Sequence, residues 1–334
     1  MEPHPFEILI LSDIHYAGRE ERHRVGHEAR AIANPLLRSL ARAYRHWFWL
    51  RDPFAHNYLL DEVCSRERGP DMVLVNGDLS CDTAFVGHSD EASFQSASEC
   101  LERLRSVYGD RLHAIYGDHE LGKTSLFGGQ GGLRCASWDR CVRELAMPPF
   151  WHKKVGRYHC IGVVSSLVAL PVYLAETLES ERSRWHRLRS EHMACIRAAF
   201  ESVRGDERVL LFCHDPTALP FLLEMPEVAV RLSQVERTVI GHLHSQRLMR
   251  LSRKLAGLPA IDFLGHSVRR LSTALGQARL WEKFRVLLCP SLAGIELFKD
   301  GGYWRATLDL RRETEVVFHF QPLHWSRKTY VKLE

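Results

Sequence analysis

The stretch YGDHELGKT, residues 116–124, follows an apolar run and allows two incompatible chemistries. Its last eight residues match the phosphate-binding pattern G-x-x-x-x-G-K-[ST], in which Lys123 would contact nucleotide phosphates and Thr124 would bind Mg²⁺. The triplet DHE, which begins at Asp118, instead suggests part of a metal site at the end of a strand. The residues at the ends of the other strands decide between a P-loop NTPase at 117–124 and a metal centre.

The sequence after this stretch argues against a P-loop. A P-loop needs a helix that begins at the Lys-Thr pair, so that the helix N-terminus faces the phosphates. Four of the five residues 128–132 are glycines, and each glycine costs a helix about 1 kcal/mol relative to alanine. We therefore expect a loop there. A P-loop would also leave the aspartates and histidines described next without a role.

Five predicted strands end in aspartate or histidine. The strands are indicated by apolar runs at 6–12, 71–76, 112–116, 209–213 and 237–240. The residues at their carboxyl ends are Asp13 and His15, Asp78, Asp118 and His119, His214, and His242 and His244. Because ligands in open α/β sheets gather at the carboxyl ends of strands, we expect these side chains to form one site.

The rest of the chain alternates between predicted helices and strands, which indicates a layered α/β fold. Helices are expected at 90–108, 134–146 and 181–203. Further strands are expected at 158–166 and 285–291, a hairpin at 295–310, and a last strand at 315–320.

Two long intervals, 19–70 and 246–284, are too long to be ordinary loops and are expected to be mainly helical insertions. In the first, segment 36–50 places leucines and aromatic residues on one side of a helix and arginines on the other. In the second, segment 268–284 combines the same residue types. Each segment could be a cap that packs on the domain, or could lie on an anionic membrane surface.

The composition is that of a globular protein, and we expect a single domain over residues 1–334. The chain is 45% hydrophobic and 26% charged, with a formal net charge of +4 and arginines spread along its length, so no specific nucleic-acid partner is predicted. Nine cysteines without a C-x-x-C pair argue for reduced thiols. Without a signal peptide or a long apolar run, we expect a cytoplasmic protein, with any membrane contact peripheral on the inner face.

The strand-end residues offer oxygen and imidazole ligands and no thiolate. Such a set favours Mn, Fe or Zn over Mg or Ca, because the hard cations prefer oxygen ligands alone. The series Asp13-x-His15, Gly77-Asp78, Gly117-Asp118-His119-Glu120, His214 and Gly241-His242-x-His244 resembles the calcineurin-like metallophosphoesterase family. The resemblance covers residues 6–320 and implies a four-layer α/β/β/α sandwich, to which the two long intervals are additions.

The resemblance also implies the roles of these residues. One divalent metal ion would be held by Asp13, His15 and His244, the second by Asp118, His214 and His242, with Asp78 bridging both. His119 would stabilise the transition state or protonate the leaving oxygen, and Glu120 would orient its ring. Two such ions clamp a phosphate and activate a water for in-line attack on a phosphate ester or pyrophosphate.

This chain departs from the family pattern at Asp118, where the family places asparagine. The additional carboxylate is expected to bind the second metal more tightly and to weaken its Lewis acidity toward an anionic phosphate. Beyond the site, Lys123 and Arg134 could contact a substrate phosphate, or could be solvated loop residues.

The substrate is the least specified part of the prediction. The amphipathic segments suggest a lipid-linked substrate, a situation similar to that of UDP-2,3-diacylglucosamine pyrophosphatases. A phosphodiesterase or phosphatase that acts on a soluble nucleotide or phosphoprotein is an alternative. A non-catalytic scaffold with the same fold is another, although the intact ligand series argues against it.

Overall fold

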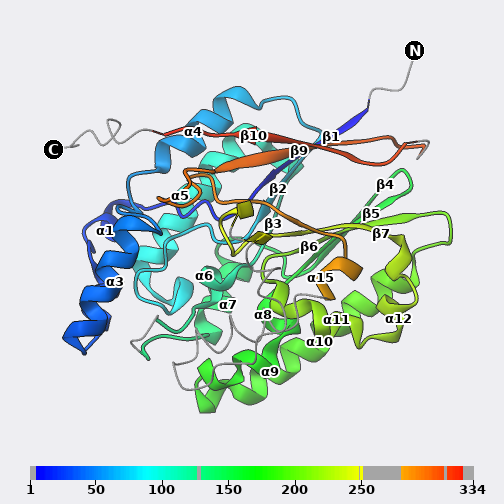
Figure 1. Ribbon diagram of the computed structural model, residues 1–334. Helices are drawn as coiled ribbons and strands as arrows, with labels where there is room; N and C mark the ends of the chain where they lie inside the picture. Colours follow the sequence, from blue (N-terminus) through cyan, green and yellow to red (C-terminus); the bar gives the residue numbers. More distant parts are fainter. Residues whose placement is uncertain (1–4, 126–128, 248, 251–279, 312–313, 326–334) are drawn as a thin grey trace.

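Two five-stranded sheets form the centre of the molecule in the computed structural model, which describes residues 5–125, 129–247, 249–250, 280–311 and 314–325 (Figure 1). The strand order is β10-β9-β1-β2-β3 in the first sheet and β4-β5-β6-β7-β8 in the second. The strands of the first sheet are β1 (Phe6–Leu11), β2 (Met72–Asn76), β3 (Leu112–Ile115), β9 (Gly302–Leu308) and β10 (Val317–Pro322). Those of the second are β4 (Trp151–Val155), β5 (Tyr158–Val163), β6 (Arg208–Cys213), β7 (Val235–Ile240) and β8 (Val286–Leu288).

Both sheets have a parallel centre, and this determines where the site forms. In the first sheet β1, β2 and β3 run parallel, whereas β9 pairs antiparallel with both β1 and β10. In the second sheet β5 to β8 run parallel and only β4 is antiparallel. The carboxyl ends of the parallel strands therefore open along one edge of each sheet.

Alternating side chains along each strand build two apolar layers. In β1, Ile8 and Ile10 belong to the core between the sheets, together with Leu210 and Phe212 of β6. Leu9 and Leu11 point the other way, into the cluster that packs against the helices. This is the period of two expected of a strand that is buried on both faces.

Helices cover the outer faces of both sheets (Figure 1). On the side of the first sheet these include α4 (Asn57–Arg66) and α5 (Glu91–Tyr108), and on the side of the second α8 (Ser165–Val168), α9 (Leu170–Tyr173), α10 (Arg182–Glu201), α11 (Leu219–Leu223) and α12 (Pro226–Ala229). The other α-helices of the described residues are α1 (Arg19–Arg22), α2 (His27–Ala31), α3 (Pro35–Trp47), α6 (Asp118–Leu121), α7 (Cys135–Arg143) and α15 (Leu280–Lys283). The predicted four-layer fold is thus confirmed.

The interval 19–70 contains α1 to α4 and lies between β1 and β2. Of the interval 246–284, residues 248 and 251–279 lie outside the described residues, and with them most of the amphipathic segment 268–284. In its described end, Trp281 and Phe284 are buried and belong to the core. Within the described residues, no helix is both long and apolar enough to cross a membrane.

The structure differs from the sequence-based expectations in three places. Residues 295–298 form a turn and no strand, so the predicted hairpin at 295–310 is wrong. β9 pairs instead with the distant β1 on one edge and with the final strand β10 on the other, so neither edge of β9 is left to pair with residues 295–298. β4 was not predicted, since its sequence WHKKV is largely polar, and β5 ends at Val163, before the expected residue 166.

Candidate metal centre

Seven side chains from the carboxyl ends of five strands meet between the two sheets. Their ligating atoms form two groups, and within each group all atoms lie within 4.8 Å of one another. The first group is Asp13, His15, Asp78 and His244, and the second is Asp78, Asp118, His214 and His242. Asp78 belongs to both. The structure therefore brings all seven predicted ligands together in an arrangement that could hold two neighbouring metal ions on a shared carboxylate.

In the first group, three ligating atoms face one point. The Nε2 atom of His244 lies 3.2 Å from the Nε2 atom of His15 and 3.2 Å from Oδ1 of Asp13. The Nε2 atom of His15 lies 3.9 Å from the same carboxylate oxygen. These atoms come from the ends of β1 and β7, which belong to different sheets, so this group exists only in the folded chain.

The second group is held together in the same way. The Nε2 atom of His214 lies 3.3 Å from Oδ2 of Asp78 and 3.6 Å from Oδ1 of Asp118. The Nδ1 atom of His242 lies 3.4 Å from the same oxygen of Asp118. Asp118, where the resemblance leads us to expect asparagine, is therefore positioned among the candidate ligands.

The histidine tautomers fit metal binding. The Nδ1 atom of His214 lies 2.6 Å from the carbonyl oxygen of Asn76, and Nδ1 of His15 lies 3.3 Å from that of Ser80. If each Nδ1–H donates to its carbonyl, the Nε2 lone pair faces the carboxylates. The Nε2 atom of His214 is buried and has no hydrogen-bond partner among the described residues. A divalent cation would satisfy it.

The ionisation of the first group also suits a cation. Burial lowers the pKa of His15 to about 4, and burial together with the neighbouring His15 holds the pKa of His244 well below its usual value, so both rings are neutral near pH 7. Burial alone would raise the pKa of Asp78, but His119 and His214 hold it well below its usual range. Neutral imidazoles and an ionised carboxylate are the forms that bind metal.

Five of the seven candidate ligands have a strained backbone. Asp13, His15, Asp78, His242 and His244 all have φ between 49° and 63°. Residues other than glycine rarely adopt this left-handed conformation, and such strain clusters at functional sites. The side chains are thus held where the regular strand geometry would not point them.

Glycines precede three of the ligands because the backbone approaches other ligands closely. A Cβ atom on Gly117 would lie 2.1 Å from Oδ1 of Asp78, and one on Gly241 would lie 2.5 Å from Oδ2 of Asp13. No side chain fits at either distance. The Gly-Asp and Gly-His pairs seen in the sequence therefore have a steric origin within the site.

His119 lies beside the two groups but belongs to neither. Its backbone N–H donates to Oδ1 of Asp78 over 3.1 Å, and its ring Nε2 lies 3.7 Å from Oδ2 of the same residue and contacts Nζ of Lys123. Burial, together with Lys123, holds the pKa of His119 well below its usual value. This position agrees with a residue that acts on substrate and binds no metal.

Glu120 has a different partner from the one expected. Its carboxylate accepts hydrogen bonds from the backbone N–H groups of Gly117, Asp78 and Leu79, at 2.6, 2.9 and 2.8 Å. It therefore ties the ends of β2 and β3 together, and no hydrogen bond joins it to the His119 ring among those found for the described residues. The reason is that three backbone donors converge on this buried carboxylate.

The remaining residues of the opening stretch exclude a P-loop. Lys123 and Thr124 do not begin a helix, because α6 ends at Leu121. The backbone N–H and hydroxyl of Thr124 both donate to the carboxylate of Glu176, at 3.0 and 2.9 Å. The guanidinium of Arg134 donates to the carbonyls of Gly131 and Leu133, so it supports this loop. Arg134 does not line the cavity described next.

A cavity of about 60 Å³ opens onto the candidate metal centre. His15, His119, His244 and Lys123 line its inner end. The other lining residues are His27, Glu28, Arg45, Trp49, Leu50, Pro53, Cys81 and Phe85. Most of them come from the interval 19–70 and were not singled out individually by the sequence. The sequence did show that segment 36–50 is rich in aromatic residues and arginines. It could not show which of these side chains point into the cavity.

A second cavity, of about 200 Å³, adjoins the first. The two share five lining residues, namely His27, Glu28, Arg45, Leu50 and Pro53. Arg45 and Glu28 form an ion pair on this common wall. The second cavity continues outward along α3 past Ala41 and Arg42.

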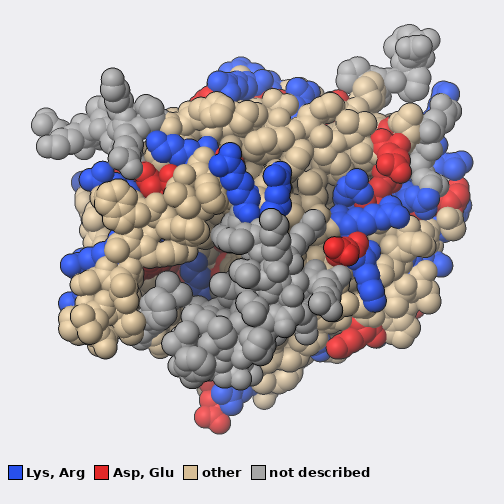
Figure 2. All heavy atoms as spheres, in the orientation of Figure 1, with Lys and Arg blue, Asp and Glu red and all other residues tan. Residues whose placement is uncertain are grey.

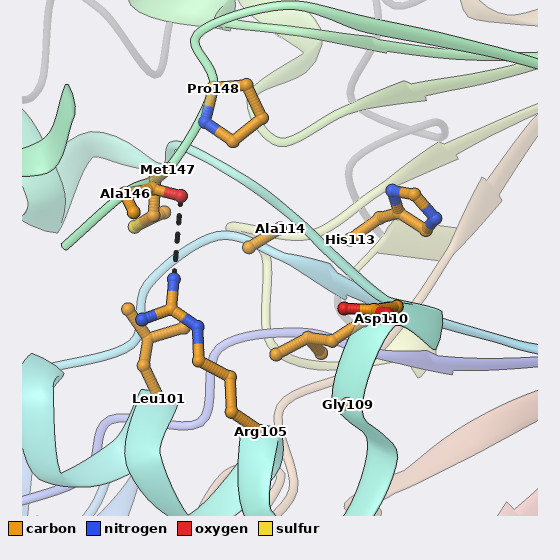
Figure 3. Close-up of a pocket in the computed structure, with 10 residues that line it drawn as sticks. Leu101, Arg105, Gly109, Asp110, His113, Ala114, Ala146, Met147 and Pro148 are labelled. Carbon is orange, nitrogen blue, oxygen red and sulfur yellow. Dashed lines mark hydrogen bonds between the residues drawn. The ribbon is translucent and has the colours of Figure 1, made fainter.

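A larger cavity, of about 470 Å³, lies elsewhere, at the start of β3 (Figure 3). Arg105 of α5 crosses it and donates to the carbonyls of Leu145 and Ala146, at 2.5 and 3.5 Å. The candidate ligand Asp118 follows the opposite end of β3. None of the seven candidate ligands lines this cavity.

Similarity to a known protein family extends over most of the chain. A model of a family described as calcineurin-like phosphoesterase matches residues 6–246, which is most of the chain. No match was found among curated proteins. Among solved structures, the chain is similar to one titled "GAP50 the anchor in the inner membrane complex of Plasmodium", with 9% sequence identity, over 97% of this chain and 90% of that chain. The TM-score of 0.35 is too low to indicate a shared fold.

Proposed function

The chain belongs to the calcineurin-like phosphoesterase family and is a metal-dependent phosphohydrolase, and from this premise we propose that it acts on an amphiphilic phosphate ester or pyrophosphate. The reaction rests on one observation, the two groups of potential ligands that share Asp78. Two divalent ions in those groups would supply Lewis acidity and an activated water for in-line attack on phosphorus.

The residues beside the ligands have separate tasks in this proposal. His119 borders the cavity, so in this proposal its ring donates a hydrogen bond to a phosphate oxygen or passes a proton toward the leaving group. Lys123 contacts the same ring and lines the same cavity, and its ammonium group attracts an anionic substrate. Glu120 acts indirectly, because it fixes the backbone that carries Asp78 and Asp118.

The amphiphilic substrate is supported by the two adjoining cavities. The inner cavity presents Lys123 and Arg45 close to the candidate ligands, which suits a phosphate. The outer cavity adds Val25 and Ala41 to the shared Leu50 as an apolar wall, with Arg42 beside them. A molecule with a phosphate at one end and an apolar part at the other matches this order of side chains.

A substrate panel tests the proposal. Metal-depleted protein is assayed with added Mn²⁺, Fe²⁺ or Zn²⁺ on a simple phosphodiester, nucleotides, phosphopeptides and acylated sugar-nucleotide diphosphates, against a His119→Ala control. We expect metal-dependent turnover, a loss of about 10²- to 10⁴-fold in His119→Ala at unchanged metal content, and a higher kcat/KM for acylated than for deacylated substrates.

Two results would contradict different parts of the proposal. Equal kcat/KM for acylated and deacylated substrates would favour a phosphodiesterase or phosphatase of soluble substrates. No metal-dependent turnover on any substrate, at any enzyme concentration, would favour the non-catalytic scaffold.

A further inference from the structure

The outer face of α3 carries large apolar side chains that the protein leaves exposed. The α3 stripe consists of Leu36, Leu40, Tyr44 and Trp47, which are 76%, 64%, 41% and 66% exposed. Their spacing places them along one side of the helix. We propose that this stripe docks on the surface of an anionic lipid bilayer.

The stripe is separate from the face through which α3 packs on the protein. Ala41 is the buried residue of α3, and it lies about a quarter turn or more away from the line through Leu36, Leu40 and Trp47. An amphipathic helix normally buries its apolar face. In α3 the apolar side chains extend beyond the face that the protein covers. The uncovered ones, the α3 stripe, are available for another contact.

Further apolar side chains enlarge this surface. Val25, which shares the outer cavity with Arg42, is 72% exposed. Leu297 is 52% exposed, and its backbone N–H donates to the carbonyl of Phe48, directly after α3, over 3.1 Å. With these two, the surface holds six of the ten large hydrophobic side chains that are exposed among the described residues. Such a concentration marks an interaction site, unlike scattered single residues.

The charge around the stripe indicates an anionic partner. From Ala29 to Arg51 the chain has no aspartate or glutamate, but it has five arginines, at 30, 38, 42, 45 and 51. Arg45 is paired with Glu28, whereas Arg30, Arg42 and Arg51 are exposed. In Figure 2 the surface at the position of α3 is mostly tan, with blue side chains at its edge. Each arginine near an anionic membrane contributes about 1 kcal/mol.

A lipid surface explains this combination better than a second copy of the chain. A two-fold dimer through α3 would place the same face on both sides and would bring arginines toward arginines. A bilayer instead takes leucine and tryptophan at the level of the acyl chains and arginine at the phosphates. One short helix with flanking arginines gives reversible, peripheral binding.

The stripe is connected to the candidate metal centre. Tyr44 at its edge stacks on Trp49 with ring centroids 6.1 Å apart, and Trp49 lies 4.6 Å from the ring of His244. Docking through α3 would therefore hold the mouth of the site near the lipid headgroups. Docking itself does not depend on the proposed substrate. Docking would serve to bring a membrane-borne phosphate ester to the site, and this purpose rests on the proposed function.

Vesicle flotation tests the docking. The wild-type protein is mixed with vesicles of phosphatidylcholine alone, or with about one third phosphatidylglycerol added, at low salt. We expect it to float with the anionic vesicles only. The double variant Leu40→Glu/Trp47→Glu should lower the binding constant at least about tenfold, because both side chains would have to carry charge into the acyl region. The matched control Val230→Glu changes a side chain that is 69% exposed and directly follows α12, away from the stripe. This variant should bind like wild type.

A second variant and an activity measurement make the result decisive. Arg30→Glu/Arg42→Glu should abolish the preference for anionic vesicles. Leu40→Glu/Trp47→Glu should hydrolyse a soluble phosphodiester at the wild-type rate, which would show that a loss of vesicle binding is not caused by unfolding. Because activity is measured apart from vesicle binding, a failure of the proposed catalysis would be seen separately.

Three outcomes would overturn the proposal. The first is wild-type protein that binds neither kind of vesicle, and the second is a double variant that floats as well as wild type. The third is self-association of the wild-type protein in analytical ultracentrifugation, together with a monomeric Leu40→Glu/Trp47→Glu variant that still binds vesicles like wild type. The stripe would then contact a second copy of the chain.

Discussion

The Nε2 atoms of His15 and His244 lie 3.2 Å apart, although 229 positions separate the two residues in the chain. Burial lowers the pKa of both rings, so two neutral imidazoles face each other with a carboxylate oxygen of Asp13 beside them. Two nitrogen lone pairs at this distance need a proton or a cation between them. A metal ion that His15, His244 and Asp13 share would meet this need.

Replacing one of these two histidines should remove one metal ion. In His244→Ala we expect the metal content to fall from about two ions per chain to about one, and hydrolysis of a phosphodiester to fall at least about hundredfold. Mass spectrometry of the metals after dialysis gives the stoichiometry. His319→Ala, at an exposed position on β10, is the control. Two retained ions in His244→Ala would disprove the assignment.

Asp118→Asn should weaken one metal site and strengthen the chemistry. The variant removes a negative charge that lies 3.4 Å from His242 and 3.6 Å from His214. We expect the second ion to bind about tenfold more weakly or worse, and turnover at saturating metal to rise, because less ligand charge opposes the anionic substrate. Metal titration with a rate measurement at each concentration tests both, and unchanged values for both would refute the prediction.

Lys123→Met should raise KM more than it lowers kcat. The ammonium group of Lys123 borders the cavity beside His119, and a charge-assisted hydrogen bond to phosphate contributes about 1.5–3 kcal/mol. We therefore expect kcat/KM to fall about tenfold to hundredfold. Lys283→Met, at an exposed position of α15, should behave like wild type. A kcat/KM in Lys123→Met equal to that of the control would show that Lys123 makes no substrate contact.

Glu120→Gln separates a structural from a catalytic role. Both carboxylate oxygens of Glu120 now accept hydrogen bonds from backbone N–H groups. Glutamine has only one acceptor oxygen, so its NH₂ group would face at least one of these N–H donors. We expect the free energy of unfolding to fall by about 2–4 kcal/mol, with kcat of the metal-loaded enzyme within about tenfold of wild type. Urea unfolding and steady-state kinetics measure the two quantities, with the exposed Glu201→Gln as control. An unchanged stability with a kcat as low as that of His119→Ala would instead support an orienting role for the His119 ring.

The stability of the fold should fall in mild acid, in part because of His192. This side chain of α10 is buried, its Nε2 accepts a hydrogen bond from the N–H of Val164, and burial lowers its pKa from 6.5 to about 3. A pKa that is lower in the folded than in the unfolded chain means that protons bind preferentially to the unfolded chain. The contribution of neutral His192 to the stability of the folded chain is therefore complete above pH 6.5 and is lost as the pH falls toward about 3.

His192→Gln should make this loss smaller. Glutamine keeps a hydrogen-bond acceptor but does not titrate, so the drop in the free energy of unfolding between about pH 7 and about pH 5 should shrink by about 2 kcal/mol. Urea unfolding at both pH values measures the drop. His186→Gln, at an exposed position on the same helix, should leave it unchanged, and equal drops in both variants would contradict the assignment.

Much of the candidate site could be predicted because its residues follow a local rule. Each ligand stands at the end of an apolar strand, and parallel strands bring their carboxyl ends to one edge whatever the details of packing. The glycines before Asp78, Asp118 and His242 were visible as part of the motifs. The helices and the central strands were found in the same way, since their hydrophobic periodicity is local.

Other features depended on how distant segments pack. The sequence by itself determined which side chains could bind metal, the layered fold and the amphipathic character of α3. Only the tertiary structure decided that Glu120 accepts from backbone groups of β2 and β3, that β9 pairs with β1, and that the stripe of α3 stays exposed. The physical reason is that hydrogen-bond partners and burial are properties of neighbours in space, and residues such as His15 and His244 become neighbours only when the two sheets stack.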